Sequence, residues 1–195
     1  MERNFLSLPS HSLGDKAGFR RPSQPKVALE SPALTVMTDL TRVSPATIGP
    51  DASIEGANRF MMMRGVRLLL VVGEREDVLG VISATDILGE RSMKVAAGRG
   101  LRRDELAVAD VMRPAEEVEV IALADLESAR VGHVVATLMH AGRQHALVVD
   151  HDSASGRTMV RGVLSLSQVA RQLGQPLQLN EVARTFAEIE AVLGH

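Results

Sequence analysis

The chain has 195 residues, 45% hydrophobic and 24% charged, which suffices for one compact core or two small ones. Its formal net charge of −2 gives no overall attraction to nucleic acid or to anionic membranes. The absence of Cys, Trp and Tyr excludes disulfides, thiolate metal sites and aromatic platforms for stacking bases. No apolar run approaches the ~18 residues of a membrane span. The N-terminal stretch lacks a hydrophobic signal segment, so we expect a cytoplasmic protein that binds neither membranes nor nucleic acid.

The first stretch, residues 1–31, is predicted to be an arm outside the folded core. It contains several Pro, Ser and Gly residues, and its apolar residues follow no period. Such a segment is either a disordered tail or an arm that packs on a partner subunit.

A first repeat is predicted over residues 32–90, with the element order β-α-β-β-α. Asp51 or Ser53 is placed to cap a helix whose apolar side contains Ile54, Ala57 and Met61. The pattern of apolar residues predicts an extended segment at 41–48, a helix from residue 54, strands at 66–72 and 79–82, and a short helix at 85–90.

A second repeat is predicted over residues 107–174. Residues 142–149 match 65–72 without a gap, and the following hairpin loop is longer and contains residues 153–156. The alternation at 117–120 predicts a strand with one face in water, and the spacing over 131–139 predicts a helix. A repeat that occurs only twice indicates a pseudo-twofold pair rather than a solenoid.

Two further segments flank the second repeat. The connector 91–106 is basic: between residues 91 and 103 it carries five cations and no acid, and it is either a solvated connector or a patch facing phosphate or a partner. After Gly174 and Pro176, apolar residues recur at helical spacing, which predicts an amphipathic helix over 175–195.

The most informative pattern is a stretch that occurs in both repeats, at 80–88 and at 162–170. Each reads Gly, two aliphatic residues, Ser, and then Asp86 or Gln168 three residues later. This pattern predicts a buried strand that runs into a helix, with Ser83–Asp86 and Ser165–Gln168 as capping boxes. Backbone N–H groups at such a turn also suit an anion, so a structural role and a ligand-binding role are both open.

Residues 32–174 resemble a tandem pair of cystathionine-β-synthase (CBS) domains, or Bateman module. The resemblance rests mainly on residues 79–88, together with the Val-Met-Thr and Val-Met-Arg triplets at 36–38 and 111–113 and the Met-x-x-Gly-Val pattern at 62–66. It implies a mixed α/β (α+β) fold of two β-α-β-β-α repeats related by a pseudo-twofold axis.

The resemblance also implies that an adenosine nucleotide (AMP, ADP or ATP) binds between the repeats. In the family pattern, Ser83 and Asp86 would contact the ribose, Thr47 and Ile48 the adenine edge, and Arg67 the phosphates. The corresponding candidates in repeat two, Gln144, His145 and Ser165, are weaker, because an amide at Gln168 cannot accept from both ribose hydroxyls as a carboxylate does.

We therefore expect a stand-alone regulatory module that forms a homodimer and signals to a partner protein of unknown identity. The alternative is a ligand-free CBS scaffold that serves only assembly. No catalytic motif supports an enzyme, and we expect no metal, because residues 61–63 (three Met) fit a helix core and flank better than a soft-metal site.

Overall fold

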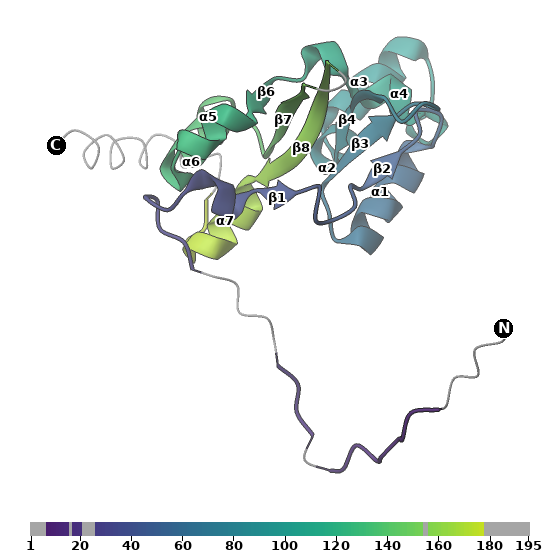
Figure 1. Cartoon of the computed structure of the whole chain (residues 1–195). Coiled ribbons are helices and arrows are strands. Elements are labelled where there is room, and N and C mark those ends of the chain that lie inside the picture. Colours follow the sequence, from purple (N-terminus) through teal and green to yellow (C-terminus); the bar gives the residue numbers. More distant parts are fainter. Residues whose placement is uncertain (1–6, 16, 21–25, 154–155, 178–195) are drawn as a thin grey trace.

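The computed structural model describes residues 7–15, 17–20, 26–153 and 156–177. From residue 27 onwards they form two α/β halves lying side by side (Figure 1). The first sheet has the order β2-β3-β4-β5, with strands Thr47–Ile48, Leu68–Val72, Val78–Ser83 and Arg113–Pro114. The second has the order β1-β8-β7-β6, with strands Thr38–Asp39, Arg157–Ser165, His145–Asp152 and Val120–Ala122.

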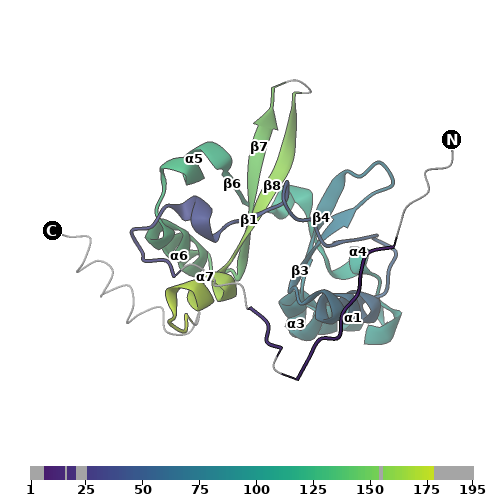
Figure 2. The ribbon, with the colours of Figure 1, turned by 60° about the horizontal axis from the view of Figure 1, so that its bottom comes forward.

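The two sheets face each other, and the helices cover their outer faces (Figure 2). The first half carries α1 (Ile54–Arg64), α2 (Ala84–Leu88), α3 (Glu90–Arg99), α4 (Val108–Val111) and the short 3-10 turn η2 (Arg103–Glu105). The second carries α5 (Leu123–Ser128), α6 (Val131–His140), α7 (Leu166–Leu173) and the 3-10 turns η1 (Ala33–Val36) and η3 (Ala115–Glu117). The predicted mixed fold of two packed repeats is confirmed.

Helix α1 shows why the local sequence folds as it does. The Ser53 hydroxyl accepts a hydrogen bond from the Gly56 N–H at 3.0 Å, so Ser53 is the N-cap. The helix ends at Gly65, whose φ of 64° is in the left-handed region that favours glycine. Between these ends it buries Ile54, Ala57 and Met61, as the apolar spacing predicts.

The two sheets exchange strands. Strand β1, near the start of the first repeat, pairs with β8 of the second sheet, and β5, near the start of the second repeat, pairs with β4 of the first. The Asp39 carboxylate on β1 binds Arg161 on β8, and this ion pair together with Thr41 holds the pKa of Asp39 at about 2. The ion pair therefore stabilises the fold fully at pH values above the ordinary pKa of a carboxyl group. This stabilisation is lost as the pH falls towards 2, where Asp39 becomes protonated.

The buried apolar residues form three clusters, and the strand exchange determines which segments contribute to each. The core of the first half is drawn from residues 46–112, and the core of the second half from residues 27–37 and 121–177. A smaller cluster around Leu70, Val81 and Leu147 lies between the two sheets. We therefore use "first half" for residues 41–114 and "second half" for residues 27–40 with 115–177, a division different from that of the sequence repeats.

The predicted strand at 117–120 is wrong in position. Residues 115–117 form the 3-10 turn η3, and strand β6 covers only Val120–Ala122, which runs parallel to β7. The reason is that β5 belongs to the first sheet and β6 to the second, so the chain has to cross between the sheets over residues 115–119.

The basic connector contains a helix that its charge pattern does not predict. Arg91 on α3 donates to the carbonyl oxygens of Val111 (2.8 Å) and Met112 (3.0 Å), and Arg103 donates to that of Ile87 at 2.8 Å. The other cations pair with carboxylates: Lys94 with Glu90, Arg99 with Asp110 and Arg102 with Asp104. The cations of 91–103 are thus engaged within the fold, which does not support a phosphate-facing patch.

The end of the predicted arm belongs to the second half of the same chain. The Val27 N–H donates to the Gln172 carbonyl oxygen at 3.2 Å, and Val27 and Leu29 pack against the second core. Residues 7–15 and 17–20 form neither helix nor strand and are exposed. The predicted C-terminal helix over 175–195 falls almost entirely outside the described residues.

We predict that residues 32–90, expressed alone, will be unfolded or self-associated, whereas residues 41–114 will unfold cooperatively. The shorter fragment lacks strand β5 and the buried residues Leu106, Val108 and Val111, each worth ~1.5–3 kcal/mol of burial. Circular dichroism during urea denaturation measures both fragments. Equal cooperativity in the two would contradict the division into halves.

Candidate ligand-binding cavities between the halves

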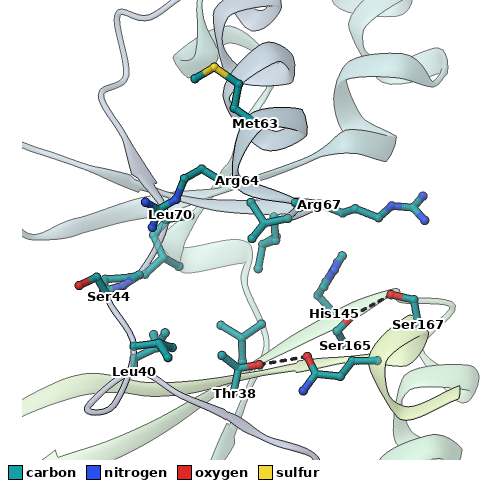
Figure 3. Close-up of a pocket in the computed structure, with 18 of the residues that line it drawn as sticks. Thr38, Leu40, Ser44, Met63, Arg64, Arg67, Leu70, His145, Ser165 and Ser167 are labelled. Atoms are coloured by element: carbon teal, nitrogen blue, oxygen red, sulfur yellow. Dashed lines mark hydrogen bonds between the residues drawn. The ribbon is translucent and has the colours of Figure 1, made fainter. Parts of the chain in front are cut away.

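A cavity of about 690 Å³ opens between the two halves. The first half contributes the segment before β2, the end of α1 and the start of β3, and the second half contributes β1, β8 and the start of α7 (Figure 3). Its apolar wall consists of aliphatic side chains, one proline and one methionine: Leu40, Val43, Pro45, Ala46, Met63, Val66, Leu68, Leu70 and Val163.

The charged residues that line this larger cavity are all arginines, namely Arg64, Arg67 and Arg171, and no carboxylate lines it. Arg64 lies 5.9 Å from the ring centre of Phe60, and Arg171 Nε donates to the Ser167 carbonyl oxygen at 3.4 Å. None of the three arginines forms an ion pair with a carboxylate in the described part of the chain. The cavity therefore carries uncompensated positive charge and suits an anion.

The polar floor of the larger cavity is built by β1, β8 and α7. Thr38 Oγ1 donates to Gln168 Oε1 at 3.2 Å, and the Ser165 and Ser167 hydroxyl oxygens are 3.0 Å apart (Figure 3). The predicted Ser165–Gln168 capping box is therefore wrong, since the Ser165 side chain accepts no hydrogen bond from the backbone N–H groups that begin the helix. The Gln168 side chain reaches across to Thr38 on β1 instead, a strand whose position the local pattern does not reveal.

A second cavity, of about 210 Å³, lies on the other side of the first residues of β7. It is lined by residues of the strand-to-helix stretch at 80–88. Here the predicted capping box is confirmed: Asp86 Oδ2 accepts from the Ser83 N–H at 2.9 Å and from the Ser83 hydroxyl. Arg143 pairs with Glu119 at 2.9 Å. This smaller cavity thus holds charges of both signs, and its Asp86 carboxylate is already engaged in the helix cap.

The comparisons with known proteins concern the first half most directly. The family model of the CBS domain matches residues 36–92. Residues 36–92 form a CBS domain. A search of the curated proteins finds no match to the chain.

Solved structures show the fold of the whole pair. A conserved protein from Pyrococcus horikoshii is 20% identical, with a TM-score of 0.55, over 78% of this chain and 98% of that one. A CBS-domain containing protein from Agrobacterium tumefaciens is 21% identical, with a TM-score of 0.51, over 68% and 88% of the two chains. The CBS domain of a bacterial CNNM/CorC family Mg²⁺ transporter is 20% identical, with a TM-score of 0.50, over 77% and 79%. The tandem arrangement inferred from the repeats is thereby confirmed, and we refer to the molecule as a CBS pair.

Each cavity of this CBS pair combines the strand-to-helix stretch of one repeat with the residues before a central strand of the other. Ser83, Asp86, Gln144 and His145 line the smaller cavity. Ser165 and Arg67, with His145 again, line the larger one. The sequence-based assignment placed Arg67 with Ser83 and Asp86 around one nucleotide, and the structure does not bring Arg67 into their cavity.

The residues that line the larger cavity differ from the predicted site in two further ways. Thr47 and Ile48 line neither cavity; they pair with Leu70 and Val71 in the β2–β3 ladder, whereas Pro45 and Ala46 just before them line the larger cavity. Sequence reasoning missed five polar residues of the larger cavity, which come from the loop before β2 and from β1, α1 and α7 and share no motif: Thr38, Ser44, Arg64, Ser167 and Arg171.

His145, at the start of β7, lines both cavities together with Leu68. The half-buried imidazole has its pKa lowered to about 4, first by burial and then by the positive charge of Arg67, while Asp86 acts in the opposite direction. His145 is therefore neutral near neutral pH. Among the described residues, no helix is long and apolar enough to cross a membrane, and no three His, Asp or Glu side chains form a group that could hold a metal ion.

Proposed function

We propose that this CBS pair is a regulatory module that binds an adenosine nucleotide in its larger cavity and signals its presence to a partner protein. The observation that supports this most is the charge of the cavity: three arginines and no carboxylate line about 690 Å³ of space between the halves. Arginine recognises phosphate through paired, charge-assisted hydrogen bonds, so a phosphorylated ligand fits this lining.

The remaining surface of the larger cavity suits a nucleoside. Aliphatic side chains on both halves offer an apolar slot for a base, and the hydroxyls of Thr38, Ser44 and Ser165 offer partners for a ribose. The preference for adenosine comes from the CBS resemblance rather than from the shape of this slot.

The proposal places the nucleotide away from the Ser83–Asp86 stretch that the sequence favours. The smaller cavity, at about 210 Å³, lies below the ~300–1,000 Å³ of ordinary small-molecule sites. In addition, Asp86 Oδ2 already accepts two hydrogen bonds from Ser83. One of the two carboxylate oxygens of Asp86 is thus taken up by the helix cap, whereas the arginines of the larger cavity are free of carboxylate partners among the described residues.

The first experiment uses the absence of Trp and Tyr, because the absorbance of a co-purified nucleotide would dominate the ultraviolet spectrum of the protein. Calorimetric titration of the stripped full chain with AMP, ATP and unphosphorylated adenosine then measures the role of the phosphates. We expect both nucleotides to bind at least about tenfold more tightly than adenosine, since one charge-assisted bond is worth ~1.5–3 kcal/mol. Thermal stability unchanged by all adenine nucleotides would favour the ligand-free scaffold instead.

We further propose that the module acts as a homodimer. Large apolar side chains are exposed on the helices of the first half: Met62 and Met63 on α1, Leu88 on α2 and Met93 on α3. Exposed apolar groups of this kind favour association with a second protein surface. Light scattering with and without nucleotide measures both the assembly and its response to the ligand.

A further inference from the structure

His145 is placed where it would contact an anion in the larger cavity. Figure 3 shows its ring pointing from β7 towards the side of the cavity that carries Arg67. The backbone of His145 is paired with Ser165 in the β7–β8 ladder, so the position of the side chain is set by the sheet. No hydrogen bond engages its ring nitrogens within the described residues, which leaves both nitrogens available to a ligand.

Charged residues that line both cavities surround His145. On the larger side the facing groups are Arg64, Arg67 and Arg171, all positive. On the smaller side they are Asp86, Arg113 and the Arg143–Glu119 ion pair. Without a ligand, burial and Arg67 together keep the imidazole neutral despite Asp86. An anion bound among the arginines would offset their field and add a negative charge next to the ring.

We propose that the larger cavity is a proton-linked phosphate site, in which His145 takes up a proton and donates a hydrogen bond to the ligand's phosphate on binding. The proton comes from the solvent and stays on the imidazole for as long as the ligand is bound. This inference rests on the proposed function only in that the cavity binds a phosphorylated ligand; it does not require that the ligand be adenosine.

The expected size of the effect follows from the linkage between proton binding and ligand binding. The pKa of His145 is about 4 in the free protein. If binding returns it to the ordinary value of ~6.5, affinity increases about tenfold when the pH falls from ~7.5 to ~5.5. Over the same interval a phosphate monoester takes up its own proton with a pKa of ~6, which acts in the opposite direction. A control is therefore needed that removes only the contribution of His145.

The test is calorimetric titration of the full chain and of His145→Asn with AMP and with inorganic pyrophosphate, at about pH 6 in buffers of different ionisation heat. The dependence of the heat on the buffer gives the protons taken up. We expect the wild type to take up more than about half a proton beyond the Asn variant for each ligand that binds. Equal proton uptake by both proteins would overturn the inference while leaving nucleotide binding intact.

Other outcomes separate this inference from the proposed function. Pyrophosphate binding with proton uptake, but no binding of AMP here or of ATP in the first experiment, would support the proton-linked site and reject the adenosine nucleotide. Binding of neither probe would reject both. If the Asn variant does not fold, nuclear magnetic resonance of the wild-type imidazoles gives the same information. One of the six His should titrate near pH 4 in the free protein and at least about two units higher in the complex, and an unchanged titration would overturn the inference.

Discussion

Replacing Gly80 with alanine is expected to destabilise the protein by about 3 kcal/mol or more. Gly80 lies opposite Pro114 in the β4–β5 pair, and an added Cβ would collide with the carbonyl oxygen of Arg113. The colliding atom belongs to the backbone of a paired strand, so the clash is relieved only if β5 leaves the sheet. The midpoint of urea denaturation, compared with that of the wild type, measures the loss.

Two matched substitutions give this experiment its control. Gly98 lies within α3 with no atom within 4 Å of an added Cβ, so Gly98→Ala should stabilise the protein, by up to about 1 kcal/mol. Gly162, the counterpart of Gly80, meets chiefly the flexible Met37 side chain, so Gly162→Ala should cost less than Gly80→Ala. A Gly80→Ala protein as stable as the wild type would show that β5 does not pair as described.

The combined replacement of Arg67 and Arg171 by glutamine is expected to weaken nucleotide binding by about a hundredfold. Each change removes one charged donor from the larger cavity, and a charge-assisted bond of ~1.5–3 kcal/mol corresponds to about tenfold or more in affinity. Calorimetric titration with ATP measures the single and double variants. Arg75→Gln is the matched control, because Arg75 is exposed in the β3–β4 hairpin turn and lines neither cavity.

Asp86→Ala decides between the two cavities in the same titration. The sequence alone predicts that this change weakens nucleotide binding by about tenfold, through loss of bonds to the ribose. A nucleotide in the larger cavity would not contact Asp86, so its affinity should be nearly unchanged, while the loss of the Ser83 cap costs ~1 kcal/mol of stability. A tenfold loss here, with no effect of the arginine variants, would return the ligand to the smaller cavity.

Local signals in the sequence predict local structure well in this protein. The Ser53 cap, the apolar spacing of α1 and α6, and the Ser83–Asp86 capping box all depend on neighbours within a few residues, and all are confirmed. Helix α3 was missed because its charges dominate its pattern. Its buried face includes the polar Ser92, which is fully buried and donates to the Ile87 carbonyl oxygen at 2.7 Å, so apolar spacing does not mark this face.

The candidate site was harder to predict because it is built across the repeats. Arg67 follows α1 in the first repeat, whereas Ser165 and Arg171 lie beyond the hairpin of the second. No spacing within one repeat encodes that these residues face one another. The same applies to Gln168, whose partner Thr38 is 130 residues away in the chain. Aligning the repeats with each other conceals such contacts, because it pairs equivalent residues that line different cavities.

The exchange of β1 has a mechanical consequence. The chain enters the CBS pair at Val27, which is joined by a backbone hydrogen bond to Gln172 near the end of α7 (Figure 1). A force that pulls these two points apart would first peel residues 27–31 from the second half, then η1, and then β1 with its Asp39–Arg161 ion pair. Only then would tension reach residues 41–114. The second half therefore has to come apart before a force transmitted along the chain acts on the first half.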